Sequence, residues 1–301
     1  MSHSNPPHLF CFGLGYTGMA LARQLDGAGW RVSGTCRDRA QAEALAASGI
    51  SAFTFSGNSP GNDTIADVLS ESTHILSTVP PSATDSGDPV LRTFDVRLGE
   101  MKSPSWIGYL STTGVYGDTG GAVVTEEAPT APTGPRGERR VAAEQEWLSL
   151  YQSHGAPVHI FRLPGIYGPG RSNFDQLKNG KARLVHKPGH LFNRIHVDDI
   201  VQTLRASMAH PNAGAIYNVC DDEPAAPADI TAYACELSGL TPPPLVPFDD
   251  AKETMSEMAL SFWKDNRRVS NARMKDELGV SLLYPSYREG LAALWAEELA
   301  S

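Results

Sequence analysis

The chain has 301 residues, of which 41% are hydrophobic and 20% charged, and its formal net charge is −9. These proportions are typical of a globular protein of one or two domains, and the negative charge argues against nucleic acid as the main partner, since phosphate contacts need a basic surface. The four cysteines are too few and too scattered for a disulfide framework. The sequence contains no CxxC pair, so a zinc site is not expected. Residues 1–8, MSHSNPPH, have no apolar signal region, and no apolar run is long enough to cross a bilayer. We therefore expect a cytoplasmic protein without a bound metal, a membrane or a nucleic-acid partner.

The first half of the chain alternates between short apolar runs and helical patterns. In chain order, strands are expected at 8–13, 31–35, 50–55, 74–79, 106–110 and 158–163, and helices at 17–25, 41–47 and 136–151. This β-α-β-α alternation predicts an α/β fold, a doubly wound parallel sheet of the Rossmann type with helices on both faces.

The pattern changes after about residue 165. Proline and glycine become frequent, a late strand is expected at 215–219, and TPPPLVP at 241–247 reads as a stiff connector. We expect a nucleotide-binding domain over residues 1–168 and a smaller substrate-binding lobe over 169–301, with residues 195–222 returning to the first domain.

Residues 11–18, CFGLGYTG, contain a Gly-x-Gly-x-x-Gly pattern between an expected strand and an expected helix. In this context the pattern is typical of a dinucleotide site. Gly13 permits the tight turn, Gly15 lets the backbone approach a pyrophosphate, and Gly18 allows close packing of the helix on the strand. We therefore expect Gly13, Gly15, Tyr16, Thr17 and Gly18 to bind the cofactor.

The end of the second strand, GTCRDR, distinguishes NAD from NADP. An NAD site usually places an acid there, about 20 residues after the glycine turn. Cys36 occupies that position and Arg37 follows it. A guanidinium suits the additional 2′-phosphate of NADP by charge and by geometry, and Arg39 could assist. We expect NADP as the cofactor, with NAD as the alternative if Asp38 binds the ribose.

Five blocks of sequence resemble a known family. They read STTGVYG at 111–117, FRLPGIYGPG at 161–170, RIHVDDIV at 194–201, YNV at 217–219 and SNARMKDELGVSLLYPSYREGL at 270–291. In this order and spacing they resemble the extended short-chain dehydrogenase/reductase superfamily, the NAD(P)-dependent epimerase/dehydratase group, over nearly the whole chain. The resemblance implies a Rossmann domain and a small C-terminal lobe with the substrate between them.

The resemblance also implies roles for particular residues. In the family, a hydroxyl four residues before the tyrosine of VYG assists catalysis, and that position is Thr112. The family's Tyr-x-x-x-Lys pair, a general acid/base and a ribose-binding lysine, falls on Arg136 and Arg140. Pro80, in a Pro-Pro pair where typical members carry small residues beside the cofactor, is expected to contact it.

The two arginines allow two interpretations. In the first, Arg136 holds an anionic group of a ligand and Arg140 donates to the cofactor ribose, because a guanidinium cannot shuttle protons at working pH. In the second, both side chains point to solvent and pair with Glu138 or Glu144, which would contribute only a few tenths of a kcal/mol.

Two functions are compatible with these residues. One is an NADP-dependent oxidoreductase or epimerase-like enzyme, a monomer or homodimer, that acts on a small anionic or sugar-linked substrate. Tyr116, Tyr167 and Arg171 are then expected to contact the substrate, and Tyr116, Tyr167 and His196 are the candidates for the missing acid. The other is an NADP(H)-binding sensor or regulatory protein that has lost catalysis. The retained Thr112 favours the enzyme, and the lost Tyr/Lys pair favours the sensor.

Overall fold

The structure is a computed structural model that describes residues 6–56, 63–101 and 104–300. Its contacts divide the chain into two compact units, each assembled from three stretches of sequence. Unit 1 comprises Met1–Thr112, Glu138–Arg162 and Val201–Tyr217, and unit 2 comprises Thr113–Gly137, Leu163–Ile200 and Asn218–Ser301. The domain boundary expected at residue 168 stays a prediction.

Unit 1 is built on a seven-stranded sheet with the strand order β11-β7-β5-β4-β1-β2-β3. The strands are β1 (His8–Phe12), β2 (Arg31–Cys36), β3 (Ser51–Thr54), β4 (His74–Ser77), β5 (Trp106–Thr112), β7 (Val158–Leu163) and β11 (Ile216–Asn218). The pairs β3-β2, β2-β1, β1-β4 and β4-β5 are parallel. Because β1 lies between β2 and β4, the strand order reverses there, which is the topological switch point where this fold binds ligands. The predicted α/β Rossmann fold is confirmed.

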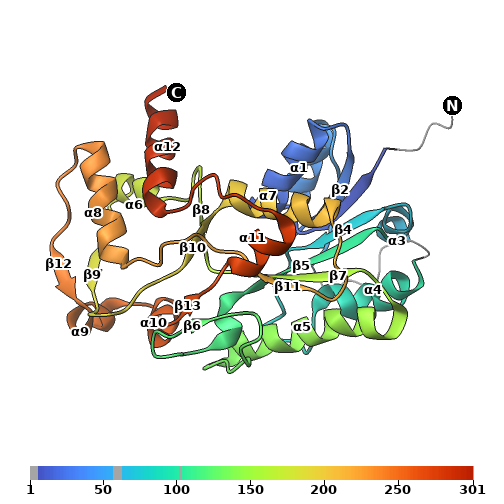
Figure 1. The fold of residues 1–301 in the computed structure, drawn as a ribbon. Helices are drawn as coiled ribbons and strands as arrows, with labels where there is room; N and C mark the ends of the chain where they lie inside the picture. Colours follow the sequence, from blue (N-terminus) through green and yellow to red (C-terminus); the bar gives the residue numbers. More distant parts are fainter. Residues whose placement is uncertain (1–5, 57–62, 102–103, 301) are drawn as a thin grey trace. The chain divides into compact units, whose positions relative to one another are not determined.

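Helices cover both faces of this sheet. They are α1 (Tyr16–Asp26), α2 (Arg39–Ala47), α3 (Asp63–Ser70), α4 (Pro89–Glu100), α5 (Pro135–His154) and α7 (Val197–Ala209). Figure 1 shows α1 and α7 on one side of the sheet and α4 and α5 on the other. The alternation along β5 gives the reason: the indole of Trp106 donates to Ser207 of α7, whereas its neighbour Ile107 packs in the core beneath α4 and α5.

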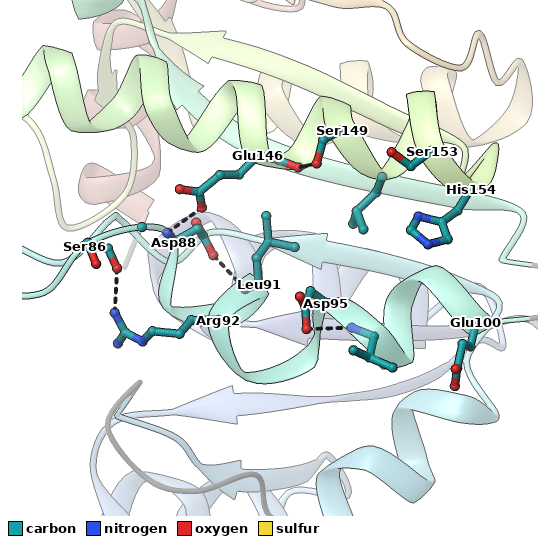
Figure 2. Close-up of a pocket in the computed structure, with 13 residues that line it drawn as sticks. Ser86, Asp88, Leu91, Arg92, Asp95, Glu100, Glu146, Ser149, Ser153 and His154 are labelled. Atoms are coloured by element: carbon teal, nitrogen blue, oxygen red, sulfur yellow. Dashed lines mark hydrogen bonds between the residues drawn. The ribbon is translucent and has the colours of Figure 1, made fainter.

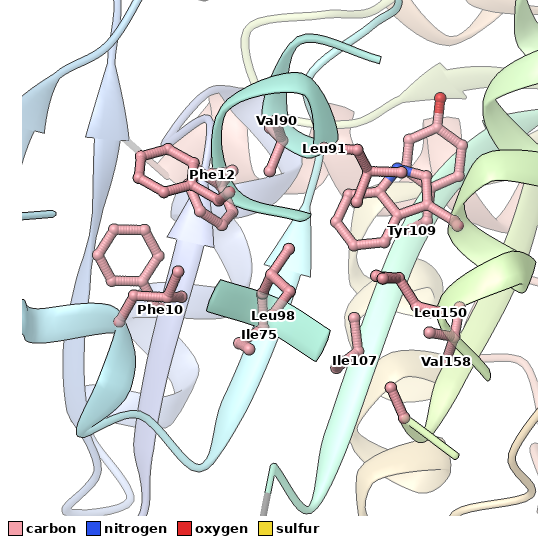
Figure 3. Close-up of a cluster of buried hydrophobic side chains, with 14 of the residues drawn as sticks. Phe10, Phe12, Ile75, Val90, Leu91, Leu98, Ile107, Tyr109, Leu150 and Val158 are labelled. Carbon is pink, nitrogen blue, oxygen red and sulfur yellow. The ribbon is translucent and has the colours of Figure 1, made fainter. Parts of the chain in front are cut away.

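The core of unit 1 lies between the sheet and helices α4 and α5. The rings of Phe10 and Phe12 in β1 pack edge to face, with their centres 4.8 Å apart. The ring centre of Phe94 in α4 lies 5.4 Å from that of Phe12. Leu98 of α4 and Leu150 of α5 belong to the same buried cluster (Figure 3). All of these side chains are almost fully removed from water, so the core holds the carboxyl ends of β1, β4 and β5 in fixed positions.

Unit 2 contains three two-stranded parallel sheets and mostly short helices. The strand pairs are β6 (Val123–Val124) with β13 (Arg268–Val269), β8 (Gly165–Tyr167) with β10 (Arg194–His196), and β9 (Leu184–His186) with β12 (Leu245–Pro247). Its helices are α6 (Asn173–Lys178), α8 (Pro227–Ser238), α9 (Phe248–Ala251), α10 (Glu257–Lys264), α11 (Ala272–Leu278), α12 (Tyr287–Ala300) and the 3₁₀ turns η1 (Thr113–Tyr116) and η2 (Lys252–Thr254). The expected connector at 241–247 therefore ends in a strand, since β9 supplies its partner.

Among the residues that the structure describes, no helix is both long enough and apolar enough to cross a membrane.

Candidate functional site

The glycine turn after β1 is locked by hydrogen bonds from the two neighbouring strands. The amide of Gly13 donates to the Thr35 hydroxyl at 3.0 Å, and the amide of Leu14 donates to the Thr35 carbonyl at 2.6 Å. Directly after β4, the Thr78 hydroxyl donates to the carbonyl of Gly13 at 2.7 Å. The ends of β1, β2 and β4 are thus tied together at the switch point of the sheet, and the path of the turn is fixed.

The three glycines differ in the space around them. A Cβ at Gly13, whose φ is +90°, would lie 2.5 Å from the Thr78 hydroxyl, and a Cβ at Gly18 would lie 2.6 Å from the carbonyl oxygen of Gly13. A Cβ at Gly15 would meet nothing within 4 Å. Gly13 and Gly18 therefore serve the turn and the packing of α1, whereas Gly15 borders open space.

This space fits a dinucleotide pyrophosphate. Gly15 is exposed and precedes α1, whose first amides lack carbonyl partners inside the helix. Tyr16 is half-buried, and Thr17 is buried under the turn. Pro80, which follows β4, is exposed.

The end of β2 carries a cation, Arg37, that forms no ion pair or hydrogen bond with the described residues. Arg37 is exposed. Asp38 is the N-cap of α2 and accepts from the amide of Gln41 at 3.0 Å. Arg39 pairs with Glu43 at 2.9 Å. Cys36, at the position where an acid was expected for NAD, is buried.

The end of β5 is fixed by a buried ion pair that the sequence did not reveal. Glu144 of α5 and Arg162 of β7 lie 2.7 Å apart, each with 4% of its side chain exposed. The Ser111 hydroxyl donates to the Glu144 carboxylate at 2.5 Å. Ser111 precedes Thr112, which is half-buried at the last position of β5. The cluster therefore holds the backbone that carries Thr112.

Arg140 and Arg136 both lie against protein groups. Nη1 of Arg140 donates to the Leu110 carbonyl of β5 at 2.6 Å and to the Tyr109 hydroxyl at 3.3 Å. The Arg136 side chain is exposed in unit 2, with its guanidinium carbon 5.3 Å from the centre of the Phe262 ring. The expected alternative, in which both arginines point to solvent and pair with glutamates, is wrong for Arg140, because its guanidinium binds β5.

The expected substrate residues have different surroundings within unit 2. The Tyr116 hydroxyl is buried and donates to the Asn218 side chain at 2.8 Å. Tyr167 is buried against the edge of His196, with ring centres 5.1 Å apart, and burial raises its pKa. Burial lowers the pKa of His196 to about 4, so this imidazole is neutral at pH 7. Arg171 is exposed, at the end of the turn that follows β8.

Arg171 and Tyr167 line a cavity of about 480 Å³ in unit 2. Two further arginines, Arg183 and Arg194, also line it. Burial lowers the pKa of Arg194 to about 10, so its guanidinium stays charged at pH 7. Asn173 closes one side and donates to Thr231 at 2.9 Å. The lining therefore holds three arginines and one acid, Asp175, whose carboxylate accepts from the Ser172 amide and hydroxyl at 2.7 Å, and this excess of positive charge suits an anion.

A second cavity, of about 550 Å³, lies in unit 1 between α4 and α5 (Figure 2). Its lining includes the carboxyl groups of Asp95, Glu100 and Glu146 and the apolar side chains Leu91 and Leu150. None of the expected site residues lines it.

No group of three or more His, Cys, Asp or Glu side chains in residues 6–56, 63–101 and 104–300 is arranged to hold a metal ion.

Several residues of the candidate site were missed from the sequence. Thr35 and Thr78 are ordinary strand-end threonines, and their contacts depend on the strand order. Arg194 lies within the block RIHVDDIV, where the sequence pattern singles out only His196. Arg183 gave no local signal, since isolated surface arginines are common.

Comparison with known proteins agrees with the fold. A family model described as the NAD dependent epimerase/dehydratase family matches residues 101–220. Protein YeeZ of Escherichia coli (strain K12) is 30% identical over 284 residues, 91% of this chain and 94% of that protein.

Solved structures show the same fold. A functionally unknown conserved protein from Silicibacter pomeroyi DSS matches with a TM-score of 0.88 and 48% identity, over 97% of this chain and 99% of that one. The dTDP-glucose 4,6-dehydratase from Bacillus anthracis str. Ames, solved in complex with NAD, matches with a TM-score of 0.75 at 19% identity, over 97% of each chain. The family model, the relative that spans most of the chain and the shared topology show that this chain belongs to the NAD-dependent epimerase/dehydratase family.

Proposed function

We propose that the protein is an NADP-dependent oxidoreductase or epimerase-like enzyme that acts on a small anionic or sugar-linked substrate. The observation that carries this proposal is the locked glycine turn, in which Gly13 and Gly18 are sterically required and Gly15 alone borders open space. A turn needed only for folding would have no reason to keep glycine at a position where a side chain meets nothing.

The choice of NADP rests on the end of β2. Arg37 is exposed and unpartnered among the described residues, whereas Asp38 caps α2 and Arg39 pairs with Glu43. A 2′-phosphate would therefore find a free guanidinium there, while a ribose hydroxyl would have to compete for the Asp38 carboxylate. NAD, which the B. anthracis relative contains, is the alternative.

Bound NADP would supply or accept a hydride. In our proposal, Gly15, Tyr16 and Thr17 approach the pyrophosphate, and Pro80 packs against the dinucleotide. Arg140 donates to the cofactor ribose through the guanidinium nitrogens that Leu110 and Tyr109 leave available.

The reacting oxygen of the substrate would accept a hydrogen bond from the Thr112 hydroxyl. The pair of Glu144 with Arg162, through Ser111, holds the backbone next to Thr112. Arg136 holds an anionic group of the substrate. Stacking on Phe262 restrains the Arg136 guanidinium and so lowers the entropy that it loses on binding.

The arginine-lined cavity of unit 2 supports an anionic substrate. Arg171, Arg183 and Arg194 can donate in pairs to a phosphate or carboxylate, and Tyr167 lies at the same cavity. The B. anthracis relative is named for dTDP-glucose, which agrees with a sugar-linked anion. Tyr116 is assigned to the same substrate from the resemblance of its block alone.

The proposal also covers the organisation of the chain. It assigns cofactor binding to residues 1–168 and substrate binding to 169–301, with 195–222 returning to the first domain. It further includes a cytoplasmic location and a monomeric or homodimeric state.

A second function, an NADP(H) sensor without catalysis, is favoured by one observation. Nη1 of Arg140 is held by a strand carbonyl, and arginine does not replace the tyrosine that serves the family as general acid/base. Such a protein would keep the glycine turn and lose turnover.

Fluorescence titration with NADPH and NADH tests the proposed cofactor. We expect NADPH to bind about 10- to 100-fold tighter than NADH, since a charge-assisted contact contributes about 1.5–3 kcal/mol. Arg37→Ala should remove this preference, whereas Arg39→Ala, which breaks only an exposed pair, should keep it. Equal affinities in the wild type would reject NADP, and failure of both nucleotides to bind would reject the dinucleotide site.

Turnover separates the enzyme from the sensor. The protein is incubated with NADP⁺ or NADPH and a panel of sugar nucleotides and small hydroxy or keto acids, and the nicotinamide absorbance is followed. Turnover that is lost in Thr112→Val supports the enzyme. Tight NADPH binding without turnover across the panel supports the sensor.

A further inference from the structure

Asp221 is a buried carboxyl group with only weak hydrogen-bond donors around it. It follows β11 in the stretch NVCDDEP, and only 2% of the residue is exposed. Its two carboxylate oxygens are both buried and accept no hydrogen bond of good geometry from the described residues, and only the backbone amides of Arg194 and Glu223 act on the group as weak donors. Burial of an ionised carboxylate with so few donors is costly, so such a group calls for a specific explanation.

The positive charge that acts on Asp221 is Arg194. The amide of Asp221 donates to the Arg194 carbonyl at 2.7 Å, so the two residues are adjacent on neighbouring segments. Each side chain shifts the pKa of the other toward the charged form, against the opposing effect of burial. The two side chains do not form a direct ion pair, since none joins them among the ion pairs of the described chain.

The other titratable groups around Asp221 do not compensate its charge. Asp222, the next residue, repels it, and Tyr167 on β8 and Cys220 have their own pKa values raised by it. Among the residues that the structure describes, Arg194 is therefore the cation that acts most strongly on Asp221.

Arg194 also lines the arginine cavity, with Arg171 and Arg183. Nη1 of Arg194 donates to the Phe192 carbonyl at 3.3 Å, and the charge of the guanidinium acts both on Asp221 and on an anion bound in the cavity. A bound anion and an ionised Asp221 would both need this charge, and each would raise the free energy of the other by like-charge repulsion.

We propose that Asp221 is the internal counter-ion of Arg194, and that an anion bound in the arginine cavity replaces it, so that Asp221 takes up a proton when the anion binds. This inference rests on the proposed anion cavity. Asp221 thereby acts as a positioning residue: it leaves Arg194 available to the ligand when it is neutral, and it competes with the ligand when it is ionised.

Sulfate is a suitable probe because it keeps two charges across the neutral and alkaline range. Its affinity is measured by thermal shift at constant ionic strength between pH 6.5 and 9. Burial raises the pKa of Asp221 to about 8. If only the protonated form accepts the anion, the dissociation constant should rise about tenfold between pH 7 and pH 9. Adding saturating sulfate to unbuffered protein at pH 8 should take up about half a proton per chain.

Two variants separate this inference from a general effect of pH. Asp221→Asn should bind sulfate with less than a twofold change over the same range and take up no proton. Asp222→Asn is the matched control. Its carboxylate binds Asn271 and Lys275 at the surface and repels Asp221, so this variant should keep the rise of the dissociation constant with pH and the proton uptake, with the midpoint moved to lower pH. The same profile in wild type and Asp221→Asn would overturn the role of Asp221 and leave the anion cavity standing.

Two further variants locate the bound sulfate. Arg183→Ala should weaken binding, and Arg37→Ala should not. No binding of sulfate at pH 7, or binding that depends on Arg37, would overturn the anion cavity together with this inference. If Asp221→Asn fails to fold, the proton uptake of the wild type tests the role of Asp221. Sulfate binding at pH 8 without proton uptake would contradict the proposal.

Discussion

Neutralising Glu144 should destabilise unit 1 strongly. Glu144→Gln keeps the shape of the side chain but removes the charge that faces Arg162 at 2.7 Å. The Arg162 guanidinium would then be a buried cation without its counter-ion. Because Ser111 also donates to this carboxylate, the loss extends to the end of β5.

The burial of the pair sets the expected magnitude. Both side chains are 4% exposed, so solvent screens the unpaired charge very little. Removing one partner of a buried pair costs about 3–5 kcal/mol. A glutamine oxygen can still accept one hydrogen bond, so we expect about 3 kcal/mol. That is a large share of the 5–15 kcal/mol by which a typical native protein is stable.

Urea unfolding followed by tryptophan fluorescence measures this effect, since Trp106 and Trp147 are buried in unit 1. The midpoint should fall while the slope of the free energy of unfolding against urea stays unchanged. Glu43→Gln is the matched control, because its pair with Arg39 is exposed and contributes less than about 0.5 kcal/mol. A Glu144→Gln protein as stable as the Glu43→Gln protein would refute the reasoning.

The other predictions concern ligand binding and pH. Gly15→Val should fold normally and lose NADPH affinity, since its side chain enters the open space over the turn; unchanged affinity in a calorimetric titration would make that glycine merely structural. Arg140→Ala should weaken NADPH binding by about 1–3 kcal/mol, and Arg136→Ala should weaken only the binding of a substrate or anion. Arg139→Ala is the control and should change neither affinity. Titration of the three variants with both ligands checks this, and equal affinities in all three would exclude both roles. Burial raises the pKa of Asp221 to about 8, above its unfolded value, so the folded protein keeps a proton that the unfolded chain releases, and stability falls from about pH 4 to pH 8. Asp221→Asn should therefore gain a few kcal/mol relative to wild type as the pH of a urea titration is raised from 5 to 8.5, and a pH-independent difference would contradict this.

The first turn of the fold could be predicted because its signals are local. The apolar run and glycines place β1 and α1, which the structure has at His8–Phe12 and Tyr16–Asp26. By contrast, α4 (Pro89–Glu100) was not predicted, although Asp88 at its N-cap and the proline after it are ordinary start signals. The strand at Leu245–Pro247 was read as connector, because its partner β9 lies far away in sequence.

The candidate site divides in the same way. The glycine turn and Arg37 were predictable, because the residues that indicate them are adjacent in the sequence. The partners of Arg140 were not, because Leu110 lies 30 residues away and becomes its neighbour only when β5 packs against α5. The pair of Glu144 with Arg162 was likewise hidden: from the sequence, Glu144 was a candidate partner of Arg140, four residues before it on the same helix.

A crystal structure of the protein with NADP⁺ tests the central claim most directly. We expect the pyrophosphate over Gly15 and the 2′-phosphate on Arg37, with the Thr112 hydroxyl on the nicotinamide side of the cofactor. A dinucleotide bound away from the glycine turn, or a 2′-phosphate that makes no contact with Arg37, would contradict it.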